Sequence, residues 1–159
     1  MFRTSAILGL VWLILPAMSR PALGVPQASE LQTLSDAIRV SLESQQPEFA
    51  VEREFVSEDS VIQRWAHGAE RVVITLHDKP SYADAVEALN VIPGRLAGSA
   101  HPEPLPPGLA AHGFIYVRHG RDGTPTLYFV KGKRVVKVSG PSEQIAVWFA
   151  FKVAEHLPS

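Results

Sequence analysis

The sequence contains no cysteine. This absence excludes a disulfide scaffold, a thiolate nucleophile, an iron–sulfur cluster, cysteine-ligated zinc and covalently attached haem. A basic excess is also missing, because 15 Lys and Arg residues stand against 16 Asp and Glu residues, so the composition does not indicate a nucleic-acid-binding protein. The hydrophobic content of 46% is too high for a disordered chain.

Sequence motifs of the common enzyme classes are absent as well. The chain has no GxSxG elbow, no SxxK sequence, no P-loop and no HExxH pair. We therefore predict no cofactor.

Residues 1–24 have the features of a secretory signal peptide. Arg3 supplies a positive charge, residues 6–15 form an apolar segment, and small residues precede a cleavage site after Gly24. Retention as a membrane anchor is the alternative, although the uncharged stretch is shorter than the about 20 residues that a spanning helix needs. We expect residues 25–159 to form a single exported domain, periplasmic or secreted, with no transmembrane segment after cleavage.

Helix signals lie near both ends of this expected domain. Ser29 and Gln32 have the spacing of a capping box ahead of an apolar stripe, which predicts a helix that ends before Pro47. Ser81 can cap a short central helix, and a final helix is predicted to follow Ser142.

Six segments have the composition of strands: residues 49–56, 61–66, 71–77, 113–119, 126–131 and 134–139. In the first of them, the alternation places Glu52 and Glu54 in solvent. It places the apolar residues Phe49, Val51 and Phe55 on the opposite, buried face. Short links between consecutive strands favour antiparallel pairing. The sequence therefore predicts an α+β fold, with one antiparallel sheet of about six strands and the helices packed on one face.

The two halves of the chain show the same order of elements. Their strands start at a nearly constant offset, which would fit two βββα pseudo-repeats preceded by an N-terminal helix. Coincidence is the alternative, since a hairpin followed by a helix is common. Residues 93–112 lie between the halves and hold five of the thirteen prolines. We interpret them as a crossover loop, with a flap, a docked segment or an interdomain linker as alternatives.

Four residues near strand ends are candidates for chemistry. His77 and Asp78 could act as a catalytic pair close to the Ser81 helix start, and His112 and His119 are candidate metal ligands. None of the histidine spacings matches a known metal-binding pattern, so each of these residues could equally be a surface residue at the end of a strand.

The charge of the chain changes sign along its length. Residues 25–107 hold six basic and thirteen acidic residues, whereas residues 108–159 hold seven basic and three acidic residues. Candidate anion-binding residues of the second half are Lys131, Lys133, Arg134 and Lys137. Lysine and arginine on a hairpin can instead serve to protect a sheet edge from aggregation.

Trp148 and Ile145 fall outside the apolar stripe of the last helix. An exposed tryptophan beside an isoleucine is typical of a binding hot spot, unless the first helix covers both. Our leading hypothesis is an exported, non-enzymatic module that binds an envelope protein or an anionic envelope component. The alternative is a small exported hydrolase or metal-binding protein that uses His77, Asp78, His112 and His119.

Overall fold

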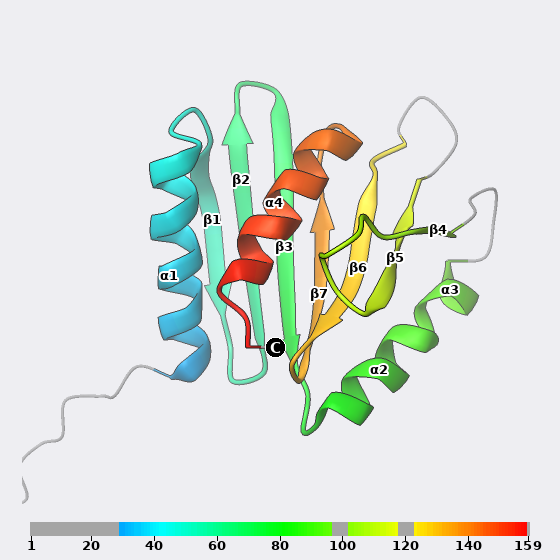
Figure 1. Ribbon diagram of the computed structural model, residues 1–159. Helices are drawn as coiled ribbons and strands as arrows, with labels where there is room; N and C mark the ends of the chain where they lie inside the picture. The colour runs from blue at the N-terminus through cyan, green and yellow to red at the C-terminus, as the bar shows by residue number, and fades with distance from the viewer. Residues whose placement is uncertain (1–28, 97–101, 118–122, 159) are drawn as a thin grey trace, which may run out of the picture.

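The computed structural model describes residues 29–96, 102–117 and 123–158, and within these ranges the chain forms a seven-stranded antiparallel sheet with the order β1-β2-β3-β7-β6-β5-β4 (Figure 1). The strands are β1 (Ala50–Val56), β2 (Ser60–His67), β3 (Glu70–Asp78), β4 (Pro102–Pro104), β5 (His112–Tyr116), β6 (Thr126–Lys131) and β7 (Arg134–Ser139), and the helices are α1 (Glu30–Gln45), α2 (Tyr82–Asn90), α3 (Ile92–Arg95) and α4 (Glu143–Glu155). The predicted α+β class is confirmed. The predicted signal peptide, residues 1–24, and His119 lie outside the described residues.

The predicted strands are all present, and β4 is an addition to them. It pairs antiparallel with β5 at one edge of the sheet, within the proline-rich segment that we expected to be irregular. An edge strand tolerates proline because one side of its backbone has no hydrogen-bonding partner in the sheet.

Serine side chains cap the three longer helices. The Oγ atoms of Ser29, Ser81 and Ser142 accept hydrogen bonds from backbone amides in the first turns of α1, α2 and α4. The predicted caps are confirmed for these serines. Gln32 does not complete the capping box at Ser29, because its side chain donates to Asp36 instead.

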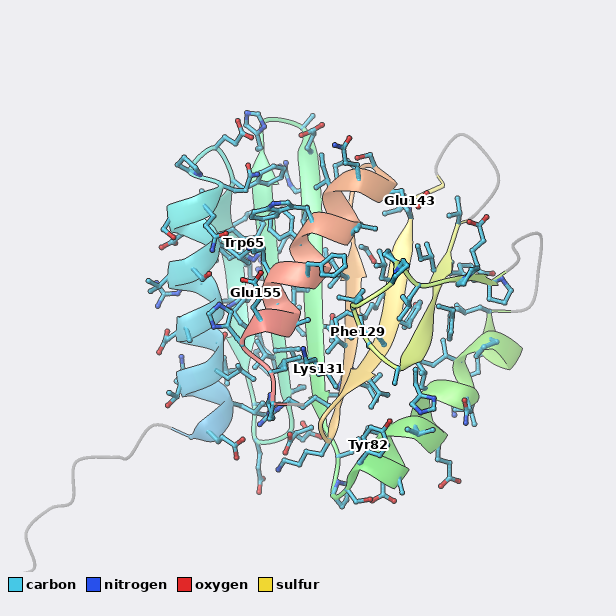
Figure 2. The ribbon with its side chains drawn as sticks, viewed as in Figure 1. Trp65, Tyr82, Phe129, Lys131, Glu143 and Glu155 are labelled. Carbon is cyan, nitrogen blue, oxygen red and sulfur yellow. The ribbon has the colours of Figure 1, made fainter. Side chains whose placement is uncertain are left out.

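The two faces of the sheet differ in what packs on them. Helices α1 and α4 lie on one face, which we call the covered face, where Trp65 and Phe129 are fully buried (Figures 1 and 2). Helix α2 packs on the other face, against Val130 of β6 and Val135 of β7. The expected packing on one face therefore describes α1 and α4, whereas α2 lies opposite because it packs against the apolar residues Val130 and Val135 on that face.

The halves of the chain share an order of elements without being related by a rotation. The strands of the two halves follow each other in mirrored order across the sheet, and the neighbours β3 and β7 are antiparallel. A twofold axis relating the halves would therefore have to be perpendicular to the sheet. Rotation about such an axis would place equivalent residues and helices on the same face of the sheet. Helices α2 and α4 lie on opposite faces, and the aligned residues Val72 and Val135 also face opposite sides. The pseudo-repeat is thus limited to the order of the elements.

A β-bulge in β1 reverses which residues of this strand face the core. Val51 pairs with Trp65 but Arg53 pairs with Arg64, so Glu52 is an extra residue in β1. Beyond the bulge, Glu54 turns to the covered face. The expectation that Glu54 lies in solvent is therefore wrong, because an extra residue shifts the alternation by one position.

Glu54 belongs to a hydrogen-bond network that ties α1 to the sheet. Its Oε1 atom accepts from Ser35 Oγ at 2.7 Å and from Gln63 Nε2 at 2.9 Å. Gln63 also donates to the backbone oxygen of Ser35, and its own oxygen accepts from Trp65 Nε1 at 3.2 Å. Gln63 is fully buried, and such groups are tolerated in a core only when their hydrogen bonds are satisfied.

The tightest glycine position of the described fold is Gly113 in β5. A Cβ atom there would lie 2.5 Å from Leu105 Cδ1 and 2.8 Å from Phe129 Cβ, and it would also press on the carbonyl oxygen of Tyr128. We predict that Gly113→Ala lowers the free energy of unfolding by about 1–3 kcal/mol, the usual cost of overpacking. Urea unfolding of residues 25–159 would measure the change. Gly94→Ala is the control, since a Cβ atom at Gly94 meets nothing within 4 Å. Equal stability of the two variants would contradict the prediction.

Candidate functional site

His77 and Asp78, the predicted catalytic pair, point to opposite faces of the sheet. Successive side chains of a strand alternate, so His77 lies on the face that α2 partly covers and Asp78 lies on the covered face. Partial burial, followed by the nearby Lys79, lowers the pKa of His77, which keeps its imidazole neutral at pH 7. Asp78 is engaged by cations, since one of its oxygens lies 2.8 Å from Lys133 Nζ.

His112, the one predicted metal ligand that the structure describes, is also separated from His77. His77 is opposite Val135, Val135 is opposite Val130, and Val130 is opposite His112. The three interstrand steps place His77 and His112 about 14 Å apart. Among the described residues, no group of three or more histidine and acidic side chains could hold a metal ion. The described members of the proposed hydrolase or metal site therefore do not share a pocket.

The cations of the β6–β7 hairpin do not form one patch. Arg134 is buried, with 3% of its side chain exposed, and it makes ion pairs with Glu30 at the start of α1 and with Asp78. Its prediction as a binding residue is wrong, because a guanidinium held in this ion-pair cluster is closed to a partner. Lys133 shares Asp78, Lys131 is half-buried on β6 (Figure 2), and Lys137 lies on the opposite face.

A broad part of the sheet has no helix over it in the described structure. We call it the open sheet face and define it by the outward-facing residues of β1, β2, β3, β7 and β6: Arg53, Phe55, Ile62, Arg64, Thr75, Lys137 and Tyr128. Phe55 and Ile62 are direct cross-strand partners with 56% and 39% of their surface exposed. An exposed apolar pair of this kind is typical of a contact surface.

The open sheet face carries positive charge. Arg53 and Arg64 are directly opposite each other, and neither has a carboxylate within 4 Å in the ranges that the structure describes. Like charges in this position destabilise a sheet. Lys137 lies over the ring of Tyr128, 5.9 Å from its centroid. The neighbouring Arg71 is neutralised by Glu52 at 3.4 Å.

Sequence reasoning named Lys137 only as part of a basic hairpin and did not single out the two arginines of this surface. Arg64 could have been found, because Val61, Gln63 and Trp65 alternate with it and all three are buried. Arg53 could not, since the bulge that moves it to the open sheet face leaves no signal in the sequence.

Trp148 and Ile145, the other predicted binding residues, are half-buried on α4. Both line a cavity of about 370 Å³, and Trp148 also borders a second depression beside Pro106 and Phe151. The ring of Trp148 packs edge-on against Phe149, with 5.2 Å between the centroids. No residue of α1 lines either cavity, so α1 leaves the Trp148 side of α4 accessible.

Comparison with protein-family models, with curated proteins and with solved structures gave no match. In the described part of the chain, no helix has the length and apolar character needed to cross a membrane. The function has to be argued from the surfaces themselves.

Asp78 stabilises the fold by balancing the buried charge of Arg134. The Nε atom of Arg134 lies 3.1 Å from Asp78 Oδ1, and α1 supplies Glu30 from the other side. We predict that Asp78→Ala lowers the free energy of unfolding by about 3 kcal/mol, because it leaves a buried guanidinium without its main counter-charge. Glu30 has 72% of its side chain exposed, so Glu30→Ala should cost only about 1 kcal/mol. Chemical unfolding of both variants tests this order, and a larger effect at Glu30 would refute it.

Proposed function

We propose that this protein is an exported, non-enzymatic binding module whose open sheet face binds an acidic polysaccharide of the cell envelope. The observation that carries the proposal is the pair Arg53 and Arg64, two exposed cations placed directly opposite each other without a carboxylate partner in the described structure. The signal-peptide features of residues 1–24 support export.

The arginine pair favours an anionic ligand. Two like charges at adjacent positions oppose folding, and an anion between them would convert this repulsion into two charge-assisted hydrogen bonds. A local arrangement that costs stability and has no structural benefit is typical of a functional site. Lys137 extends the positive charge across β7.

The shape of the surface favours an extended polymer over a small anion. From Phe55 on β1 through Ile62, Thr75 and Lys137 to Tyr128 on β6, each residue is the cross-strand neighbour of the next. Four interstrand steps make this row about 19 Å long. No single small anion reaches the arginine pair and Lys137 together.

The combination of apolar surface and cations favours a polysaccharide among the anionic polymers. Phe55 and Ile62 offer an exposed apolar surface on which a sugar ring can pack, while Arg53 and Arg64 beside them and Lys137 farther along the sheet face the acidic groups. Nucleic acid offers the same combination of rings and anions. The predicted export of the chain favours the polysaccharide.

The arginine pair can be tested with residues 25–159 and immobilised polygalacturonate, with neutral dextran as the reference polymer. We expect the wild-type chain to bind polygalacturonate and not dextran, and the Arg53→Gln/Arg64→Gln variant to bind about 10- to 100-fold more weakly. The variant should be at least as stable as the wild type, because a like-charge pair has been removed.

The matched control is Lys152→Gln. Lys152 lies on α4, away from the open sheet face, and is paired with Glu155 at 2.7 Å, so its removal should leave the affinity unchanged. Equal affinity of the wild type and the double arginine variant would overturn the proposal. Stronger binding to anionic vesicles than to polygalacturonate would show that the ligand is a lipid surface and not a polysaccharide. Stronger binding to poly(dT) would likewise identify the ligand as single-stranded nucleic acid.

A further inference from the structure

A second surface, independent of the open sheet face, lies where three distant parts of the chain meet. The connection from α1 to β1, the turn between β2 and β3, and the start of α4 lie at one end of the sheet (Figure 1). Residues of these three parts line the cavity of about 370 Å³ beside Trp148. This volume is within the range of pockets that hold small molecules.

Aromatic rings form much of the wall of this cavity. Phe49 and Phe149 are buried at its base, with ring centroids 5.4 Å apart and planes at 76°. His67 packs edge-on against Phe49 at 5.4 Å, and Trp148 packs edge-on against Phe149 at 5.2 Å. Phe49 and Phe149 expose only 4% and 1% of their surface, so the accessible aromatic surface of the lining comes mainly from Trp148 and His67.

The charge of the cavity lining is negative. Glu48 and Glu70 lie on its rim, and no lysine or arginine lines it. Glu70 Oε2 is 3.7 Å from His67 Nδ1, which is an ion pair only when the histidine is protonated. Within the described ranges, Glu48 has no basic partner within 4 Å.

We propose that this cavity binds a small quaternary ammonium compound. The faces of aromatic rings attract cations, most strongly those of tryptophan, and cavities that combine rings with carboxylates suit cations that donate no hydrogen bonds. A quaternary ammonium group fits this description, because its methyl groups pack against the rings while its charge is balanced by Glu48 and Glu70.

The proposal can be tested by titrating residues 25–159 with choline and measuring the heat of binding. The matched probe is 3,3-dimethylbutan-1-ol, which has the shape of choline and no charge. We expect saturable binding of choline and at least about tenfold weaker binding of the alcohol. Intrinsic fluorescence gives a second readout, since Trp148 borders the cavity and Trp65 is fully buried.

Two variants separate the contributions of ring and charge. Glu70→Gln should weaken choline binding about fivefold to tenfold and leave the alcohol unaffected, because it removes one charge and keeps the shape of the rim. Trp148→Leu should abolish the preference for choline while keeping an apolar side chain against Phe149. Urea unfolding of both variants shows whether they are folded.

We expect the affinity for choline to depend on the positive charge of choline and not on the residues of the open sheet face. The Arg53→Gln/Arg64→Gln variant should bind choline as the wild type does, so the two proposals can fail separately. Equal affinity for choline and the alcohol, absence of saturable choline binding, or unchanged affinity in both the Glu70→Gln and Trp148→Leu variants would overturn the assignment of this cavity.

Discussion

The antiparallel pairing of β3 with β7 is the constraint on which the rest of the structure depends. It joins the three strands β1, β2 and β3 to the four strands β7, β6, β5 and β4 through six residue pairs, from Val73 opposite Ser139 to Asp78 opposite Arg134. The same register brings Thr75 beside Lys137 and so makes the open sheet face continuous. At the other end, it delivers the buried charge of Arg134 to Asp78, so that the acidic first half of the chain neutralises a cation of the basic second half.

The unequal covering of the sheet follows from the sequences of its strands. Val130 of β6 and Val135 of β7 give α2 an apolar patch on one face, and α4 packs on the other face of these strands, whereas β2 alternates between buried residues such as Gln63 and exposed residues such as Arg64. Helix α2 has nine residues and is therefore about 13 Å long, too short to extend over the whole sheet. The open sheet face is thus the part of this face that α2 does not reach, because α2 packs against the apolar residues of β6 and β7.

Periodicity and capping patterns predicted the fold class, the starts of α1, α2 and α4 and every strand except β4, because these depend on neighbouring residues. The face of the sheet on which each residue lies was harder to predict from the sequence. Arg134 and Lys137 are both cations in one short strand, and alternation alone does not tell which of them is buried; a partner more than 100 positions away, Glu30, closes the cluster around Arg134. Arg53 depends on a bulge, which is set by the pairing of β1 with β2 and not by the residues of β1.

The two proposed surfaces meet at the turn between β2 and β3, and Arg71 shapes both. Its Nη1 atom donates to the backbone oxygens of Gly68 at 2.7 Å and Glu70 at 2.8 Å, which fixes the turn that carries one rim of the cavity. Its Nε atom pairs with Glu52, the extra residue of the bulge. Because Glu52 neutralises Arg71, this arginine can hold the turn without adding its charge to that of Arg53 and Arg64. The positive charge of the open sheet face and the negative charge of the cavity can therefore coexist in one small fold without neutralising each other.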